Sequence, residues 1–171
     1  MIYKIWSRFL AWISDIMIST SPPNIKAKHI RELTNKVLPG DIVCRKTYYL
    51  DAYFIKGEYS HSGFVISDQD MIHAVSEGVE KIDILDFVKD SDGFILLRPE
   101  YKNVDKCIDY AKEQIGKPYD FLFSRKDDSR LYCHELTSRI LNQDNIKIEP
   151  EHDIIYANDF IRNFSKILEC P

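Results

Sequence analysis

Two short apolar runs separated by a brief polar break restrict the fold more strongly than any other feature. Residues 61–67 read HSGFVIS, residues 71–76 read MIHAVS, and Asp68-Gln69-Asp70 lies between them. Short apolar runs bounded by Asp and Ser are typical of β-strands, and so short a break favours a hairpin. The chain should therefore contain an antiparallel sheet, with further strands expected at residues 41–46, 78–84 and 93–98.

Helical spacing of apolar residues appears on either side of these strands. Residues 104–115 keep this spacing and stop at Gly116-Lys117-Pro118, which is typical of a helix end. Residues 133–141 predict another helix after a polar loop. These patterns predict one α+β domain, in which a small antiparallel sheet packs against the helix that begins at Cys133. Shorter elements are expected as helices at 25–37 and 158–163 and as a strand near the C-terminus.

Composition and charge exclude some classes of protein. The 171 residues are 44% hydrophobic and 29% charged, as in an ordinary globular domain. The net charge is −4 and no basic stripe is visible, which argues against a nucleic-acid partner. The four cysteines are far apart and form no CxxC pair, so reduced thiols in a cytosol fit better than a disulfide framework.

The first eighteen residues, MIYKIWSRFLAWISDIMI, are apolar but are interrupted by Lys4, Arg8 and Asp15. They show neither the unbroken apolar centre of a signal peptide nor the length of a spanning helix. We interpret residues 1–37 as an N-terminal helical extension that docks on the domain formed by residues 38–171. Contact of the first helix with a membrane surface, or an unrecognised export signal, are the alternatives, and a cytoplasmic location is expected.

Cys133 is the strongest candidate for a nucleophile. It follows a polar loop and opens a predicted helix, where unpaired N–H groups would stabilise a thiolate and an oxyanion. The other cysteines have weaker positions, within a strand, within a helix and beside the C-terminus: Cys44, Cys107 and Cys170.

His61 and His73 lie on the two arms of the predicted hairpin, an even number of residues apart. A three-residue loop would pair His73 with Val65, whereas a tighter turn centred on Ser67 would set the two histidines opposite each other. Either register places both rings on one face of the sheet. Three interpretations fit these residues alone: a catalytic trio with Cys133, structural residues with satisfied hydrogen bonds, and a metal site.

The chain resembles the permuted NlpC-type papain-like amidases (YiiX/YebB-like) in four places, the first of which consists of two segments. The segments occur in the permuted order: LPGDIV with YSHSGFVI (38–43 and 59–66), MIHA (71–74), GKPYDF (116–121) and YCHEL (132–136). The resemblance implies a circularly permuted papain-like fold, with Cys133 as nucleophile, His61 as general base and His73 orienting His61. Cys133 is then expected to react as a thiolate at pH values well below the pKa of a free thiol. A contact of about 4 Å between Cys133 and His61 is also expected.

The resemblance also assigns weaker roles and shows departures. Tyr119 would line the substrate cleft. His134 replaces a small residue after the nucleophile, where it would crowd the cleft or add a proton donor to substrate binding. His73 stands where some relatives carry glutamate, and Glu77 is the substitute if the register slips.

The implied function is a cysteine hydrolase that cleaves an amide or ester through an acyl-enzyme, without cofactor or metal. An acyltransferase or phospholipase resembling lecithin:retinol acyltransferase shares the first half-reaction and is the first alternative. A non-catalytic module on the same fold and a zinc site of Cys133, His61, His73 and His134 are the others. Peptides, amino-acid amides and lipids are the expected substrates.

Overall fold

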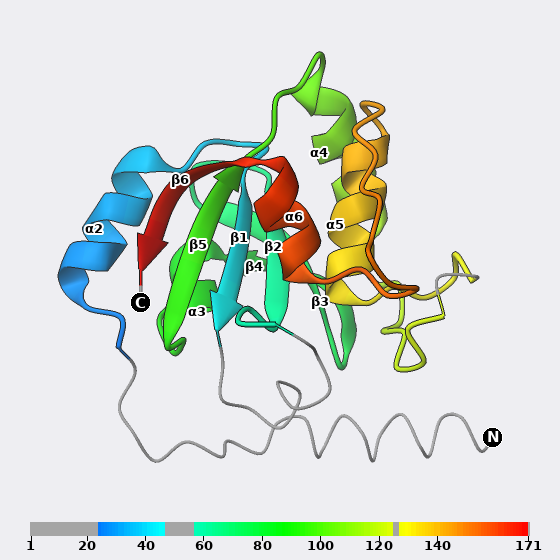
Figure 1. Cartoon of the computed structure of the whole chain (residues 1–171), viewed down its shortest axis with the longest axis horizontal. Coiled ribbons are helices and arrows are strands. Elements are labelled where there is room, and N and C mark those ends of the chain that lie inside the picture. The colour runs from blue at the N-terminus through cyan, green and yellow to red at the C-terminus, as the bar shows by residue number, and fades with distance from the viewer. Residues whose placement is uncertain (1–23, 47–56, 125–126, 171) are drawn as a thin grey trace.

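The computed structural model describes residues 24–46, 57–124 and 127–170 (Figure 1). The helix predicted over residues 1–18 lies outside these residues. No helix in the described part of the chain combines the length and the apolar character needed to cross a membrane.

A six-stranded antiparallel sheet forms the centre of the molecule, in the order β4-β3-β2-β1-β5-β6. The predicted strands and the α+β class are therefore confirmed. The strands are β1 (Ile42–Lys46), β2 (His61–Val65), β3 (Asp70–Val75), β4 (Gly78–Asp83), β5 (Gly93–Arg98) and β6 (Ser165–Cys170).

The helices cover both faces of this sheet (Figure 1). Alternate strand residues point to opposite faces, and two apolar clusters result. One cluster includes Ile42, Phe64 and Ile72 and joins the sheet to α4, α5 and α6. The other includes Val43, Val65 and Met71 and joins it to α2 and α3. The helices are α2 (Ala27–Lys36), α3 (Ile84–Val88), α4 (Val104–Glu113), α5 (Cys133–Asn142) and α6 (Ala157–Asn163).

The β2–β3 hairpin adopts a register between the two that were expected. Gly63 pairs with His73, so both expected pairings, Val65 with His73 and His61 with His73, are wrong. The turn sets this register, because Ser67 Oγ accepts hydrogen bonds from the backbone N–H groups of Gln69 (3.2 Å) and Asp70 (2.9 Å). The separation stays even, so His61 and His73 share a face as diagonal neighbours.

The segment between residues 84 and 92, where no helix or strand was predicted, contains α3. Asp83 caps this short helix by accepting a hydrogen bond from Leu85 N (2.7 Å). The cap turns the chain under the sheet, where Phe87 becomes fully buried. α3 is thus the element that supports the histidine face of the β2–β3 hairpin.

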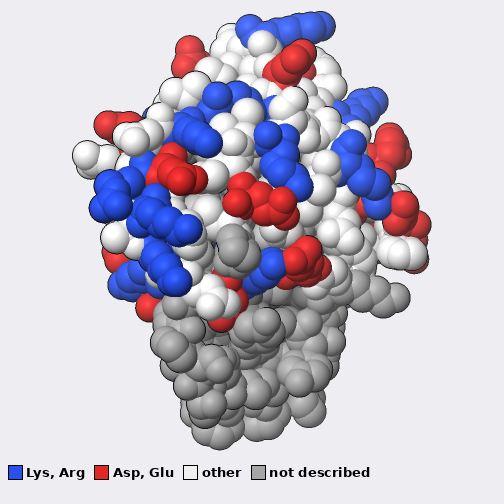
Figure 2. Space-filling view, turned by 60° about the vertical axis from the view of Figure 1, so that its left-hand side comes forward, with Lys and Arg blue, Asp and Glu red and all other residues white. Residues whose placement is uncertain are grey.

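Asp41, within the PGD segment, ties the start of β1 to the end of β5. Its buried carboxylate accepts two hydrogen bonds from Arg98, both of 2.7 Å, and a third from Leu38 N (2.9 Å). The face of the molecule that carries α2 and β6 displays Lys and Arg side chains among Asp and Glu side chains (Figure 2).

Gly78 begins β4 where the β3–β4 turn meets the turn after α4. Its φ is +129°, and a Cβ there would lie 2.6 Å from the carbonyl oxygen of Lys117. Gly116 also has a positive φ, +88°, but a Cβ there would meet nothing within 4 Å. Both positions are strained for an L side chain, and Gly78 is also sterically closed.

We expect Gly78→Ala to lower the free energy of unfolding by about 2–4 kcal/mol, because backbone strain and a backbone clash add. Gly116→Ala is the matched control and should lose only about 1–2 kcal/mol, from strain alone. Urea unfolding at neutral pH measures both values. Equal losses would show that the contact between Gly78 and Lys117 does not restrict this turn.

Candidate active site

The start of α5 is fixed against the sheet by the segment that follows α4. Leu131 N donates to the carbonyl of Pro118 (3.0 Å), and Tyr119 forms an isolated parallel bridge with Leu131. Tyr132 is then the extended N-cap residue, and Cys133 is the first residue of α5. The Cys133 side chain is buried. The predicted position of the candidate nucleophile at a helix start is therefore what the structure shows.

Asp120, in the GKPYDF segment, holds the loop in front of α5. Its buried carboxylate accepts hydrogen bonds from Leu122 N (3.1 Å) and Ser124 N (2.7 Å). Phe123, held in this loop with φ +50°, packs its ring 5.0 Å from that of Tyr132. The ring centre of Tyr119 lies 6.4 Å from that of Phe123. Tyr119, expected to line the cleft, thus contacts Phe123.

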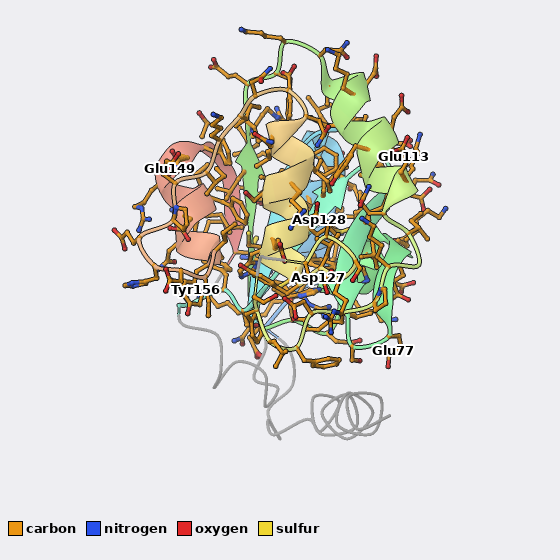
Figure 3. The ribbon with its side chains drawn as sticks, turned by 90° about the vertical axis from the view of Figure 1, so that its right-hand side faces the viewer. Glu77, Glu113, Asp127, Asp128, Glu149 and Tyr156 are labelled. Carbon is orange, nitrogen blue, oxygen red and sulfur yellow. The ribbon has the colours of Figure 1, made fainter. Side chains whose placement is uncertain are left out.

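A small cavity of about 20 Å³ reaches Cys133. Its wall is mostly apolar and comes from three segments: Phe123, Tyr132 to His134, and Ile154 to Tyr156. Ile155 N donates to Tyr132 Oη (2.9 Å), which holds the last segment against α5. In Figure 3, Tyr156 at the start of α6 and Asp127 in the loop before α5 both lie toward the N-terminal end of α5. The sequence patterns did not identify residues 154–156 as part of the site.

His61 and His73 are in direct contact. His61 Nε2 lies 2.9 Å from His73 Nδ1, and His73 Nε2 lies 3.2 Å from Glu80 Oε1. Glu80 is opposite His73 in the β3–β4 register. Sequence reasoning named Glu77 as the alternative acid and missed Glu80. Glu77 lies in the turn (Figure 3), where it accepts a hydrogen bond from Ser76.

The order of these contacts fixes where the protons lie. A carboxylate can only accept, so His73 Nε2 carries the proton that is donated to Glu80. His73 Nδ1 is then an acceptor, and His61 Nε2 must carry the proton that is donated to it. Neutral His61 is left with a bare lone pair on Nδ1. The chain from Glu80 through His73 therefore prepares His61 to accept a proton at Nδ1.

Phe87 and Arg45 form the surroundings of this histidine pair. The ring of Phe87 stacks on His61 and meets His73 edge-on, each at 5.4 Å, and the Arg45 guanidinium lies 4.6 Å from the centre of the Phe87 ring. Burial and then the Arg45 charge lower the pKa of His61 well below its usual range, and His73 and His134 add to this. The same two causes lower the pKa of His73 to about 3. Both imidazoles are therefore neutral at neutral pH.

His134 occupies the other side of β2. Ser62, which follows His61 in the strand, points to α5, and its Oγ lies 2.8 Å from His134 Nδ1. The same nitrogen lies 3.4 Å from Cys133 Sγ. Burial lowers the pKa of His134 to about 3. His134, expected only to touch substrate, is thus also a direct neighbour of the thiol.

The hydroxyl groups around His134 determine its tautomer. Thr137 has one hydroxyl proton and donates it to the carbonyl of Cys133 (3.2 Å). Ser62 Oγ lies 3.2 Å from Thr137 Oγ1 and must therefore donate to it. Ser62 then accepts from His134, so Nδ1 of His134 carries its proton. An imidazole in this form presents an N–H, and not a lone pair, to Cys133.

The predicted site residues thus form two groups, one on each side of β2. His61 and His73 contact each other above Phe87, while Cys133 and His134 contact each other at the start of α5. His134 is the last of the four contributions to the lowered pKa of His61, after burial, Arg45 and His73. Within the described ranges, no group of three or more His, Cys, Asp or Glu side chains is arranged to hold a metal ion.

Comparison with known proteins identifies the family and the fold. A family model described as "Permuted papain-like amidase enzyme, YaeF/YiiX, C92 family" matches residues 36–165. Among solved structures, the chain resembles the crystal structure of metalloprotein YiiX from Escherichia coli O157:H7, with a TM-score of 0.59 and 20% identity over 67% of this chain and 71% of that one. At this identity the likeness establishes the fold alone. No curated protein matches the chain in sequence.

Proposed function

Because the chain belongs to the permuted papain-like amidase family, we propose that it cleaves an amide or ester through an acyl-enzyme on Cys133, with His61 as general base and His73 as the residue that orients it. One observation carries these assignments. The hydrogen-bonded chain from Glu80 through His73 leaves a lone pair on Nδ1 of His61, whereas His134 presents an N–H. Of the three histidines in the two groups, His61 is thus the one that we assign to remove the proton of the thiol.

In the first half-reaction, His61 Nδ1 takes the thiol proton as Cys133 Sγ attacks the carbonyl carbon. The carbonyl oxygen becomes an oxyanion, which the first N–H groups of α5 can stabilise. The carbon–nitrogen or carbon–oxygen bond then breaks, and His61 returns the proton to the leaving amine or alcohol. The acyl group stays on Cys133 as a thioester.

In the second half-reaction, His61 takes a proton from water as the oxygen attacks the thioester. The carbon–sulfur bond breaks, Cys133 regains its proton, and the carboxylic acid leaves. The lowered pKa keeps His61 unprotonated before each step and makes the protonated ring return its proton readily, while it weakens the ring as a base. An acceptor alcohol or amine in place of water would turn the same intermediate into acyl transfer.

The neighbouring groups give this base its orientation. His73 holds His61 Nε2, and Glu80 holds His73, so the bare nitrogen of His61 keeps one direction. The substrates that fit the family and the apolar wall beside Cys133 are peptides, amino-acid amides and lipid amides or esters.

The first test is acyl transfer to Cys133 from p-nitrophenyl acetate. A panel of amino-acid amides, muropeptides and lipid amides then shows which substrates the protein cleaves. We expect a stoichiometric burst of nitrophenol and an acetyl group on Cys133, found by mass spectrometry of the intact protein and its peptides. Cys133→Ala should lower turnover at least about 1000-fold, because the covalent route is lost.

Cys107→Ala is the matched control, since Cys107 is a buried thiol on α4 whose pKa burial raises to about 11. It should retain the burst. Acetylation of another residue, or undiminished turnover by Cys133→Ala, would contradict the proposal.

A further inference from the structure

The ring of His134 is held beside the candidate nucleophile by residues from two other elements. Ser62 on β2 contacts Nδ1 at 2.8 Å, and Phe160 on α6 meets the ring edge-on, with the ring centres 6.0 Å apart. The same Nδ1 lies 3.4 Å from Cys133 Sγ. The side chain is 1% exposed. Because the ring is enclosed and held in this way, Nδ1 stays next to the sulfur without any rearrangement.

Two observations place a proton on Nδ1 of this ring. The chain of hydroxyl groups from Thr137 through Ser62 ends in an acceptor for His134. The other nitrogen, Nε2, is buried and has no hydrogen-bond partner among the described residues. A proton on Nε2 would leave a buried N–H group unpaired, which is rarer in proteins than an acceptor with an unused lone pair. Nδ1 therefore carries an N–H group within reach of both Ser62 Oγ and Cys133 Sγ.

The ring offers this N–H group without a charge. Burial lowers the pKa of His134 to about 3, so the ring is neutral at neutral pH. A positive charge on it would oppose protonation of His61, since His134 is already among the causes that lower the pKa of His61. A neutral N–H group can stabilise negative charge on the sulfur and still leave His61 able to take the thiol proton.

We propose that the Nδ1–H group of His134 is a catalytic hydrogen-bond donor to the Cys133 thiolate. Ser62 and Thr137 are positioning residues, which keep the proton on this nitrogen. The inference rests on the proposed function, in which Cys133 is the nucleophile. The N–H bond itself stays intact, because the thiol proton goes to His61. As negative charge develops, the hydrogen bond shifts from Ser62 Oγ to the sulfur.

A thiolate occurs twice in the proposed reaction. It forms when His61 removes the proton of the thiol, and it forms again when the carbon–sulfur bond of the acyl-enzyme breaks. A hydrogen bond to a charged acceptor is stronger than one to a neutral acceptor. The donor therefore stabilises the thiolate more than it stabilises the thiol or the thioester, and it accelerates both half-reactions.

Replacement of His134 with leucine and with asparagine tests the donor. Leucine is close to histidine in size and has no donor, whereas the asparagine amide presents an N–H near the position of Nδ1. We expect His134→Leu to slow alkylation of Cys133 by iodoacetamide about 10-fold at pH 7, and His134→Asn to stay within about threefold of wild type. The pH below which labelling falls should be the same in both variants, because His61 sets it.

The His61→Ala background reports the thiolate directly. Without this base, labelling of Cys133 follows the ionised fraction of the thiol. Adding His134→Leu should move the midpoint of the pH profile up by about one pH unit, which is a tenfold loss of thiolate. Adding His134→Asn should leave the midpoint in place. One midpoint shared by all three proteins would overturn the inference, because a merely structural ring does not change the ionisation of the thiol.

Phe160→Leu is the matched control for packing, since it alters the ring contact with His134 and removes no hydrogen bond. Its labelling rate should stay within about twofold of wild type. Equal losses in Phe160→Leu and His134→Leu would contradict the donor role. Lack of any reaction of wild-type Cys133 with iodoacetamide would instead contradict the proposed function.

The ¹⁵N resonances of the His134 ring test the positioning residues. We expect the Nδ1–H form in the wild-type protein at pH 7. Thr137→Val frees the Ser62 hydroxyl to donate to Nδ1, so the Nε2–H form should appear and labelling should slow. Thr137→Ser keeps the hydroxyl and should restore the wild-type form and rate. An Nε2–H form in the wild-type protein would refute the donor role of His134.

Discussion

Replacing His61 with Ala should slow alkylation of Cys133 by iodoacetamide about 100-fold at pH 6. In the wild-type protein the pKa of His61 lies well below its usual range through burial, so the ring is still an unprotonated base at this pH. Without this base the reaction must use the small thiolate fraction of a thiol with a pKa near 8.5, which falls about tenfold per pH unit. The rate of labelling between pH 5 and 9, with the site found by peptide mapping, measures the effect.

The same experiment tests selectivity among the cysteines. Burial raises the pKa of Cys44, of Cys107 to about 11, and of Cys170. These thiols should therefore stay unlabelled at pH 6 while Cys133 reacts. Labelling of Cys44 ahead of Cys133 would place the reactive thiol on β1 and exclude the proposed nucleophile.

Three further variants assign the base. His73→Ala should slow labelling only a few-fold, because His73 orients His61 and does not contact the thiol in the proposed reaction. His29→Ala, on α2, is the control for the loss of a histidine elsewhere. His134→Ala should not change the pH below which the rate of Cys133 labelling falls. If His134→Ala shifts that pH and His61→Ala does not, the general base is His134 and the assignment to His61 is wrong.

Local signals in the sequence account for most of the fold. The hairpin, the end of α4 shortly before Gly116 and the start of α5 at Cys133 each depend on residues a few positions apart, and each is confirmed. The hairpin register is wrong in both expected forms because one hydroxyl, Ser67 Oγ, sets the turn. A side-chain hydrogen bond of this kind shifts a register by two residues without changing the pattern of apolar residues.

The sequence patterns did not predict the contacts between segments that are distant in the chain. Glu80 reaches His73 because a two-residue turn at Ser76-Glu77 sets the β3–β4 register. The sequence indicated the strand, but its pairing was not worked out. Phe87 lies on a helix of only five residues, too short for a periodic pattern. Residues 154–156 have no regular structure, and a hydrogen bond from Ile155 to Tyr132 ties them to the residue before Cys133.

The motif segments predicted which residues form the candidate site better than they predicted which of these side chains contact each other. Cys133 at the helix start and the His61–His73 pair were both anticipated. The contact of His134 with the thiol was not, because the side of the ring that meets Sγ depends on Ser62 and Thr137. Alternation along β2 sends His61 toward Phe87 and Ser62 toward α5, which only the three-dimensional structure can relate to the start of α5.

Acidification from pH 7.5 to 4.5 should remove most of the stability of the protein. Burial lowers the pKa of His61, His73 and His134 in the folded state, whereas an unfolded histidine has a pKa near 6.5. The stabilising effect of neutral rings is thus complete above about pH 6.5 and is lost as the pH falls toward the folded values.

Each ring costs at most about 1.4 kcal/mol per pH unit below 6.5, so the three together cost at most about 8 kcal/mol at pH 4.5. His61 and His73 share one hydrogen bond, and protonating both would place two cations in direct contact. A typical domain has only about 5–15 kcal/mol of stability. Burial raises the pKa of Glu135, which acts in the opposite direction and reduces the loss at low pH.

Urea unfolding at several pH values measures this slope, and neutral replacements assign it. His134→Asn removes one titrating ring from the core, so we expect the slope between pH 6.5 and 4.5 to decrease by up to about 1.4 kcal/mol per pH unit. His152→Asn is the control, because that side chain is exposed on the loop before α6. A slope that is the same in wild type, His134→Asn and His152→Asn would mean that His134 is not held neutral by burial, and that its ring reaches water in the folded protein.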